Sequence, residues 1–434
     1  MKFTNGFWLV RDEFQADYVR DIYEVEEREN ELLAFAPYKQ IQGRGDTLNI
    51  GMMTYTFTAP AKDILGIHMV NHAGNYVKSP SFELYGDLDK SPERKCEKAS
   101  GKEKWTLKSG KLSLEFETGS PEMKFYGDGR ELTCIKSKTT GMMHHKQGMN
   151  YLVSGLNLGV GELVYGLGER FTPMVKNGQT VDIWNEDGGT ASEISYKNIP
   201  FYYTTKGYGV FVNHPGRVSF EVGSEKVETV QFSVEDEELE YFVIYGPTPL
   251  EIIEKYTALT GRPALPPKWS FGLWLTTSFT TNYDEATVNS FIDGSEQRHI
   301  PLSVFHFDCF WMKGFEWCNF TWDKDMFPDP AGMLERFHKR GLKICVWINP
   351  YIAQKSPLFG EAMEKGYLLM KDNGRVWQWD MWQAGMGLVD FTNPDACSWY
   401  QSKLKALLDV GVDCFKTDFG ERVPTNVKWF DGSD

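Results

Sequence analysis

The sequence has little that would place the chain at a membrane or on a nucleic acid. No apolar run approaches the roughly 18 residues of a membrane span. The segment from Met1 to Val10 has one Lys and mixed polar residues, without the apolar core of a signal peptide. The net charge is −14, and no Lys/Arg cluster is available for phosphate binding. We therefore expect a cytoplasmic protein with neither a membrane nor a nucleic-acid partner.

The usual motifs of metal and cofactor sites are also missing. The seven Cys residues are scattered and form no CxxC pair, which argues against a zinc site or a disulfide framework. No glycine-rich phosphate loop follows any expected strand. Internal repeats and low-complexity segments are absent as well. The sequence thus predicts no metal and no cofactor.

The composition is that of a folded protein with a substantial core. Hydrophobic residues make up 41% and charged residues 24% of the 434 positions. This length is enough for two or three domains. Aromatic residues reach 15%, with 14 Trp. Because most large aromatic side chains fill cores, they give only a weak indication of stacking on sugars.

Residues 1–246 have the pattern of a β-sandwich. Short runs of β-branched and aromatic residues alternate with polar ones, and Gly and Pro separate them. Helical periodicity is scarce, apart from one expected turn near 17–31. The strands are expected at 54–57, 112–116, 209–212, 218–222 and 227–234.

A helix and a proline-rich connector, together residues 247–268, separate this region from the next. Pro249 is at a tolerated first-turn position of a helix over 250–260, and Gly261 ends it. The run Arg262-Pro-Ala-Leu-Pro-Pro267 is stiff and marks a domain boundary.

Residues 269–434 alternate between strands and helices. Apolar strands separated by helices predict a parallel sheet covered by helices, and a (β/α)8 TIM barrel is favoured over an open doubly wound sheet. Only four barrel strands are expected before Asp434, so this region predicts a truncated, N-terminal half of a barrel. The strands are expected at 269–275, 302–307, 343–348 and 413–417, and the helices at 284–298, 330–341, 358–365 and 395–410.

Reactive groups of a parallel barrel lie at the carboxyl ends of its strands. Asp418 follows the fourth strand, where a carboxylate could support an oxocarbenium-like transition state of glycoside cleavage. Lys416, two residues earlier on the same face, would favour the ionised carboxylate. A purely structural Lys–Asp pair is the alternative. Asp308, after the second strand, either binds a ligand or caps a helix.

Other candidate residues have weaker assignments. Cys309 is more typical of a small apolar wall than of a nucleophile, and His306 of a core histidine. Phe279, Phe310 and Trp347 suit either a core or a pocket. Glu421, beyond Gly420, suits a structural hydrogen bond, and Asp187 lies in an ordinary Asp-Gly-Gly turn.

Four motifs, in this order along the chain, resemble glycoside hydrolase family 31. They are Tyr165-Gly-Leu-Gly-Glu-Arg170, His306-Phe-Asp-Cys-Phe-Trp311, Trp347-Ile-Asn-Pro350 and Phe415-Lys-Thr-Asp-Phe-Gly-Glu421. The resemblance covers essentially the whole chain and is closest to the family's bacterial cytoplasmic α-xylosidases. It implies a retaining α-glycosidase whose substrate is an oligosaccharide with a terminal α-xylose.

The resemblance also implies residue roles. Asp418 would be the nucleophile, Asp308 would bind a hydroxyl of the sugar in the −1 subsite, and Asp187 would reach towards the +1 side from a sandwich loop. The remaining residues that would line the −1 subsite are Phe279, Cys309, Phe310, Trp347, Lys416 and Phe419.

The sequence departs from the family pattern in one respect. The family's general acid/base is an Asp in a Gly-Gly-Asp context on a later strand, beyond Asp434, so we expect this fragment alone to be inactive. Phe279 and Phe310 would fill the space of the C6 hydroxymethyl group and favour xylose over glucose. The alternatives are an α-glucosidase and a non-catalytic carbohydrate-binding fragment. A homo-oligomer of the full-length protein is left open.

Overall fold

The computed structural model describes residues 1–6, 9–74, 84–85, 92–99, 101–186, 192–281 and 284–433. The chain divides into two compact units, Met1–Pro263 and Ala264–Asp434. The division falls inside the segment 247–268 that the sequence assigns to a connector. Within the described ranges, no helix combines the length and the apolar character that a membrane crossing requires.

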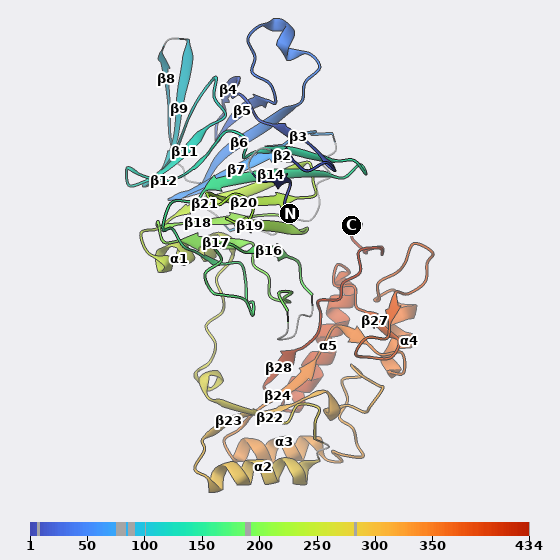
Figure 1. Ribbon diagram of the computed structural model, residues 1–434. Helices are drawn as coiled ribbons and strands as arrows, with labels where there is room; N and C mark the ends of the chain where they lie inside the picture. Colours follow the sequence, from blue (N-terminus) through green and yellow to red (C-terminus); the bar gives the residue numbers. More distant parts are fainter. Residues whose placement is uncertain are drawn as a thin grey trace. The chain divides into compact units, whose positions relative to one another are not determined.

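The first unit is built from antiparallel sheets (Figure 1). Its eight-stranded sheet has the order β15 (Val164–Gly166), β17 (Phe201–Thr204), β18 (Tyr208–Val212), β21 (Glu238–Tyr245), β7 (Ile64–Val70), β6 (Met52–Ala61), β5 (Glu31–Pro37) and β4 (Glu24–Glu27). Its six-stranded sheet has the order β16 (Thr180–Ile183), β19 (Val218–Val222), β20 (Thr229–Val234), β14 (Asn150–Asn157), β13 (Gly141–His145) and β3 (Phe14–Tyr18). A five-stranded meander has the order β12 (Arg130–Ile135), β11 (Met123–Gly127), β10 (Leu112–Glu117), β9 (Lys102–Ser109) and β8 (Glu93–Ala99). β1 (Thr4–Asn5) and β2 (Leu9–Val10) form a small hairpin.

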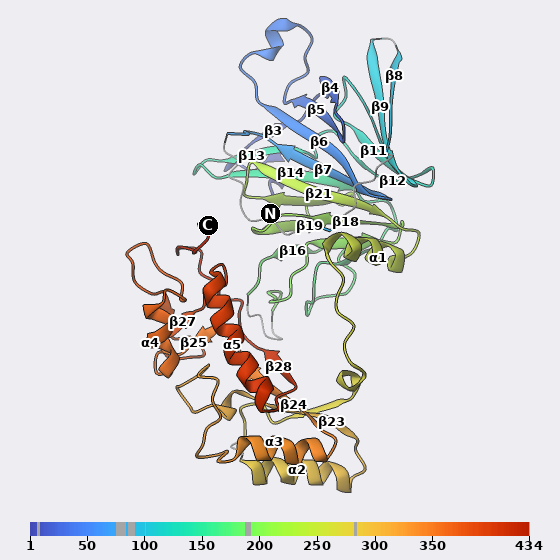
Figure 2. The ribbon, with the colours of Figure 1, turned by 180° about the vertical axis from the view of Figure 1, so that it is seen from behind.

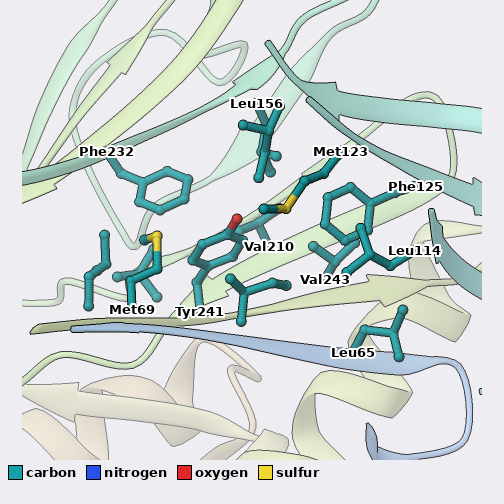
Figure 3. Packing of buried hydrophobic residues seen from close by; sticks show 14 of the residues in the cluster. Leu65, Met69, Leu114, Met123, Phe125, Leu156, Val210, Phe232, Tyr241 and Val243 are labelled. Atoms are coloured by element: carbon teal, nitrogen blue, oxygen red, sulfur yellow. The ribbon is translucent and has the colours of Figure 1, made fainter. Parts of the chain in front are cut away.

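One hydrophobic core joins these three sheets. Alternating strand residues point into it, as the period of two requires. Figure 3 shows Met123 and Phe125 of the meander near Tyr241 of β21, with Phe232 of β20 close by. Burial of this apolar surface is the main source of the unit's stability.

The prediction of a helical turn near 17–31 is wrong. This stretch ends β3 and then forms β4 and the start of β5, which pair as Glu24↔Phe35 to Glu27↔Leu32. β4 is an edge strand with the sequence Glu-Val-Glu-Glu, and its exposed charges obscure the strand pattern. The cross-strand partner that makes it a strand is not visible in the local sequence.

The helix α1 (Pro249–Thr260) belongs to the first unit. Thr248 accepts a hydrogen bond from the backbone of Glu251, a capping contact that starts the helix. Ile252 and Leu259 are buried against Phe201 and Phe211 of β17 and β18. The connector therefore becomes free of the sandwich only after this helix.

The second unit is a parallel sheet with helices on one face. The strand order is β22 (Leu273–Thr276), β23 (Leu302–Phe307), β24 (Lys343–Ile348) and β28 (Cys414–Thr417). Figure 2 shows α5 beside β24 and β28, and α2 beside α3. The helices are α2 (Glu285–Gln297), α3 (Pro330–Lys339), α4 (Pro357–Glu364) and α5 (Pro394–Val410). β25 (Tyr351–Ile352), β27 (Met386–Leu388) and β26 (Gln378–Trp379) form a separate antiparallel sheet.

The helices of this unit begin where polar caps precede them. Asp284, Asp329, Ser356 and Asn393 each accept a backbone hydrogen bond at the first turn of a helix. Three of the four helices also have Pro at the start, where no amide donor is needed. The expected strand 269–275 is partly wrong, because Lys268–Phe271 is a short 3-10 helix and β22 begins at Leu273.

Candidate active site

The alternation of the parallel strands separates core residues from candidate site residues. Phe305, Phe307, Ile344 and Val346 pack with α2, α3 and α5 in the core of the second unit. The intervening positions of β23, β24 and β28 face the other side of the sheet. Trp347 pairs in register with Lys416, and Asp308 and Asp418 directly follow their strands. The predicted site residues on these three strands therefore lie together at the carboxyl ends of the strands.

Asp418 is held by groups from two strands. Its Oδ2 accepts a hydrogen bond from Nζ of Lys416 at 2.8 Å and another from Nε1 of Trp347 at 2.8 Å. Its Oδ1 accepts from the backbone amide of Phe419 at 2.9 Å. The backbone amide of Asp418 itself donates to the carbonyl of Ile348 at 2.8 Å. These bonds fix both the position and the rotation of the carboxylate.

The same contacts keep Asp418 ionised. Burial acts to raise the pKa of this carboxyl, but the hydrogen bond and charge of Lys416, with the Trp347 hydrogen bond, lower it overall. The pKa of Lys416 is raised, since its two carboxylate neighbours outweigh the effect of burial. At neutral pH the pair is thus a carboxylate and an ammonium.

Asp308 caps a helix, which is one of the two roles left open by the sequence. Its Oδ1 accepts from the backbone amide of Cys309 at 2.8 Å and caps the short 3-10 helix Cys309–Trp311. Its Oδ2 lies 3.8 Å from Nζ of Lys416. One ammonium therefore lies between two carboxylates, and Asp308 is almost fully buried.

His306 lies one step down the same face of β23. Its Nδ1 is 2.8 Å from Oγ1 of Thr276, which is aligned with it on β22. Burial lowers the pKa of His306 to about 4, so the ring is neutral at physiological pH. It is a buried histidine within the second unit, as its position in the strand indicates.

The thiol of Cys309 has the properties of a residue that lines a pocket without reacting. Burial and the adjacent Asp308 raise the pKa of Cys309 to about 12, so its thiol stays protonated at neutral pH. A protonated thiol is a poor nucleophile. This favours the apolar reading of Cys309 over the nucleophilic one.

The aromatic candidates differ in their surroundings. Trp347 is buried, and Phe419 stacks on Trp382 with ring centroids 4.1 Å apart. Phe310 contacts Trp317 edge-to-face at 5.2 Å and remains partly exposed. Phe279 lies in the turn after β22 with its ring mostly exposed. The structure brings Trp347 to Asp418 directly, whereas Phe279 is in a loop beyond the sheet.

Two further carboxylates were candidates. Asp187 lies outside the described residues. Glu421 accepts a hydrogen bond from the backbone amide of Gly420 at 2.8 Å, the structural type of contact expected for it.

Sequence reasoning missed Trp317 and Trp382. Both lie in loops: Trp317 follows its partner Phe310 by seven residues, and Trp382 precedes its partner Phe419 by 37 residues. Trp382 has a positive φ of 64°, uncommon for a large residue. Local patterns did not indicate either contact.

Comparison with known families gives two matches. Residues 263–433 match the glycosyl hydrolases family 31 TIM-barrel domain. Residues 54–221 match the glycosyl hydrolase 31 N-terminal galactose mutarotase-like domain.

Two relatives match the whole chain. It is 55% identical to the alpha-xylosidase XylQ of Lactiplantibacillus pentosus and spans 57% of that protein. It is 48% identical to an alpha-xylosidase of Emericella nidulans and spans 58% of it. The chain thus spans little more than half the length of these relatives.

Solved structures share the fold at lower identity. A Flavobacterium johnsoniae GH31 dextranase complexed with glucose superposes with a TM-score of 0.81 at 23% identity, covering 96% of this chain and 50% of that one. A GH31 alpha-xylosidase from a soil metagenome, complexed with xylose, gives 0.75 at 17%, covering 94% and 60%.

Proposed function

Because the chain belongs to glycoside hydrolase family 31, we propose that it forms the N-terminal β-sandwich and first half of the (β/α)8 barrel of a retaining α-xylosidase. In domain terms these are residues 1–246 and 269–434, joined by 247–268. The activity is proposed for a longer protein, since the chain spans 57% of its relative XylQ. A cytoplasmic location is part of the same proposal.

The observation that carries the proposal is the held, ionised carboxylate of Asp418. In the first step Asp418 attacks the anomeric carbon, and the bond to the leaving oxygen breaks. A carboxylic acid beyond residue 434 protonates that oxygen. In the second step water, deprotonated by the same group, releases the sugar from the Asp418 ester. Two inversions leave the α-configuration unchanged.

The surrounding residues would hold the sugar. Asp308 would bind a hydroxyl in the −1 subsite, with Trp347, Lys416, Cys309 and Phe419 around the ring. Phe310 and Phe279 would fill the space of a C6 hydroxymethyl group. Asp187 would contact the sugar on the +1 side from the sandwich loop.

Preference for xylose has support from the relatives. Two relatives that match the whole chain are named alpha-xylosidases, whereas an alpha-glucosidase 2 of Bacillus thermoamyloliquefaciens is 27% identical over 59% of this chain. We expect a higher kcat/KM on p-nitrophenyl α-xyloside than on the α-glucoside. The opposite order would favour the α-glucosidase alternative and leave the family unchanged.

Substitution of Asp418 tests the central role. In the longer protein, Asp418→Asn should lower kcat by several orders of magnitude, because covalent catalysis is lost. A fluoroglycoside that traps the intermediate should label Asp418 in peptide mass spectra. Asp413→Asn is a matched control, because Asp413 makes a Lys pair at the opposite end of β28. Labelling of Asp308 or Glu421 would refute the assignment. Failure to hydrolyse any α-glycoside would favour the non-catalytic binding fragment.

A further inference from the structure

Two cavities open beside each other on the loops of the first unit. One has a volume of about 260 Å³ and the other about 250 Å³, and Arg170 and Ile194 line both. We call them together the loop groove. The residues that the argument uses are Phe171, Trp184, Glu186, Glu193, Tyr196 and Lys197.

The loop groove combines uncovered rings with charged side chains. Phe171 is 68% exposed and Tyr196 is 60% exposed. Trp184 lines the far end, where the guanidinium of Arg217 lies 5.6 Å from its ring centroid. Large exposed rings at a concave surface are typical of binding sites. Such rings can cover the apolar faces of a sugar.

The charges along the groove nearly cancel. The groove is lined by four acidic and three basic side chains. They are Asp182, Glu169, Glu186 and Glu193, and Arg170, Lys197 and Arg217. Four of these charges already form two ion pairs, with Lys197 Nζ 3.4 Å from Glu169 Oε1 and Arg217 Nη1 3.6 Å from Asp182 Oδ2. A polyanionic or polycationic ligand would find little net attraction. Mixed donors and acceptors instead suit the hydroxyl groups of a neutral ligand.

Hydrogen bonds from Arg170 and Asn198 hold the described segments around the groove. The guanidinium of Arg170 donates to the carbonyls of Leu167 at 3.0 Å, Glu193 at 3.0 Å and Asp182 at 2.6 Å, and also to Asn198. Asn198 in turn donates to the carbonyls of Trp184 at 2.8 Å and Ser195 at 2.6 Å. One partly buried arginine therefore links its own loop to β16 and to the segment that contains Glu193 and Asn198. Such preorganisation lowers the entropy cost of binding.

We propose that the loop groove is a saccharide-binding site that takes a neutral oligosaccharide by stacking on Phe171 and Tyr196. It is formed by residues of the first unit alone, and its ligand need not carry a terminal α-xylose. The choice of a saccharide over other neutral polar ligands rests on the proposed glycosidase function.

Calorimetric titration of the protein from its complete reading frame tests the site. The probes are cellotetraose and maltotetraose, which lack a terminal α-xylose, with tetragalacturonate as a charged comparison. We expect one neutral probe to bind and the anion not to bind. Tyr196→Ala and Phe171→Ala should each weaken binding roughly five- to tenfold, whereas Tyr196→Phe, which keeps the ring, should stay within about twofold.

Two controls separate this site from the barrel. Tyr23→Ala removes another exposed tyrosine of the first unit, 51% exposed, and should leave binding unchanged. Asp418→Asn should also leave it unchanged, because Asp418 is not among the residues that line the groove. Absence of binding by the unsubstituted protein would overturn the proposal, as would equal affinity of Tyr196→Ala and Tyr23→Ala. Loss of binding in Asp418→Asn alone would place the probe in the barrel. None of these outcomes depends on hydrolysis.

Discussion

Lys416 places one ammonium between two carboxylates, at 2.8 Å from Asp418 and 3.8 Å from Asp308. Because this charge helps to lower the pKa of Asp418, its removal should raise that pKa. In Lys416→Met the acidic limb of the kcat/KM profile should therefore move to higher pH. The measurement is the pH dependence of α-xyloside hydrolysis by the longer protein.

Lys343→Met is the matched control for this substitution. Lys343 pairs with Asp413 at 2.9 Å, at the amino ends of β24 and β28. Its loss should leave the acidic limb in place. An unchanged limb in Lys416→Met would show that another group controls the ionisation of the nucleophile.

His306 should make stability depend on pH. Its pKa is 6.5 as a free side chain and about 4 in the folded protein. Below pH 6.5 the unfolded chain binds a proton that the folded protein does not, so stability falls as the pH drops towards 4. The titration of His306 alone should lower the free energy of unfolding by about 2 kcal/mol at pH 5 relative to pH 8.

Denaturant unfolding at pH 8 and pH 5 checks this expectation. His306→Gln should reduce the loss between the two pH values, because Gln does not titrate. His299→Gln is a control at the end of α2, outside the sheet. An equal pH dependence in His306→Gln and the unsubstituted protein would contradict the assignment.

At the scale of elements, much of the second unit was predictable. Asp284 before α2 and Asp329-Pro330 at the start of α3 are local signals, and the strands Leu302–Phe307 and Lys343–Ile348 were predicted with their observed bounds. Edge strands such as β4 were not, because pairing with β5 rather than local composition determines them.

The candidate site also has features that the sequence predicts and features that it does not. The position of Asp418 after an apolar strand, and Lys416 on the same face, can be read from the sequence. The hydrogen bond from Trp347 cannot, because it depends on the register of β24 against β28. The stack of Phe419 on Trp382 likewise depends on a loop whose path has no local pattern.

The loop after β15 gives an element-scale prediction. Gly168 has φ +89°, and a Cβ there would lie 2.2 Å from the carbonyl oxygen of Lys197. Gly168→Ala should therefore displace the segment that carries Tyr196 and destabilise the first unit by about 1–3 kcal/mol beyond a simple φ penalty.

Gly148→Ala isolates the φ penalty. Gly148 has φ +95°, with open space where a Cβ would lie. Denaturant unfolding of both variants measures the difference. Equal destabilisation would show that the loop yields to the added methyl group.

For the whole molecule, we expect the chain 1–434 alone to lack α-xyloside hydrolysis. A retaining mechanism needs a second carboxyl group about 5 Å from the nucleophile, and we propose that it lies beyond the chain. Within the described residues, β22 and β28 form the two edges of the parallel sheet, which invites aggregation. Hydrolysis and gel filtration of the expressed chain check both points.

The first unit should behave differently. It has a core of its own, so residues 1–263 should fold and unfold cooperatively when expressed alone. A soluble 1–434 monomer as active as the longer protein would show that the acid/base has been misplaced.

The strand order also determines when each sheet can be completed during synthesis on the ribosome. β21 lies between β18 and β7 in the eight-stranded sheet, although it is the last strand of the unit to be made. Until Tyr245 has emerged, β4 to β7 cannot join β15, β17 and β18. Among the described strands, β8 to β12 of the meander pair with sequence neighbours alone and can form much earlier. A nascent chain halted near residue 200 would therefore hold a folded meander beside an unfinished sheet. The exposed apolar surface and unpaired strands of that sheet are where we expect a chaperone to bind.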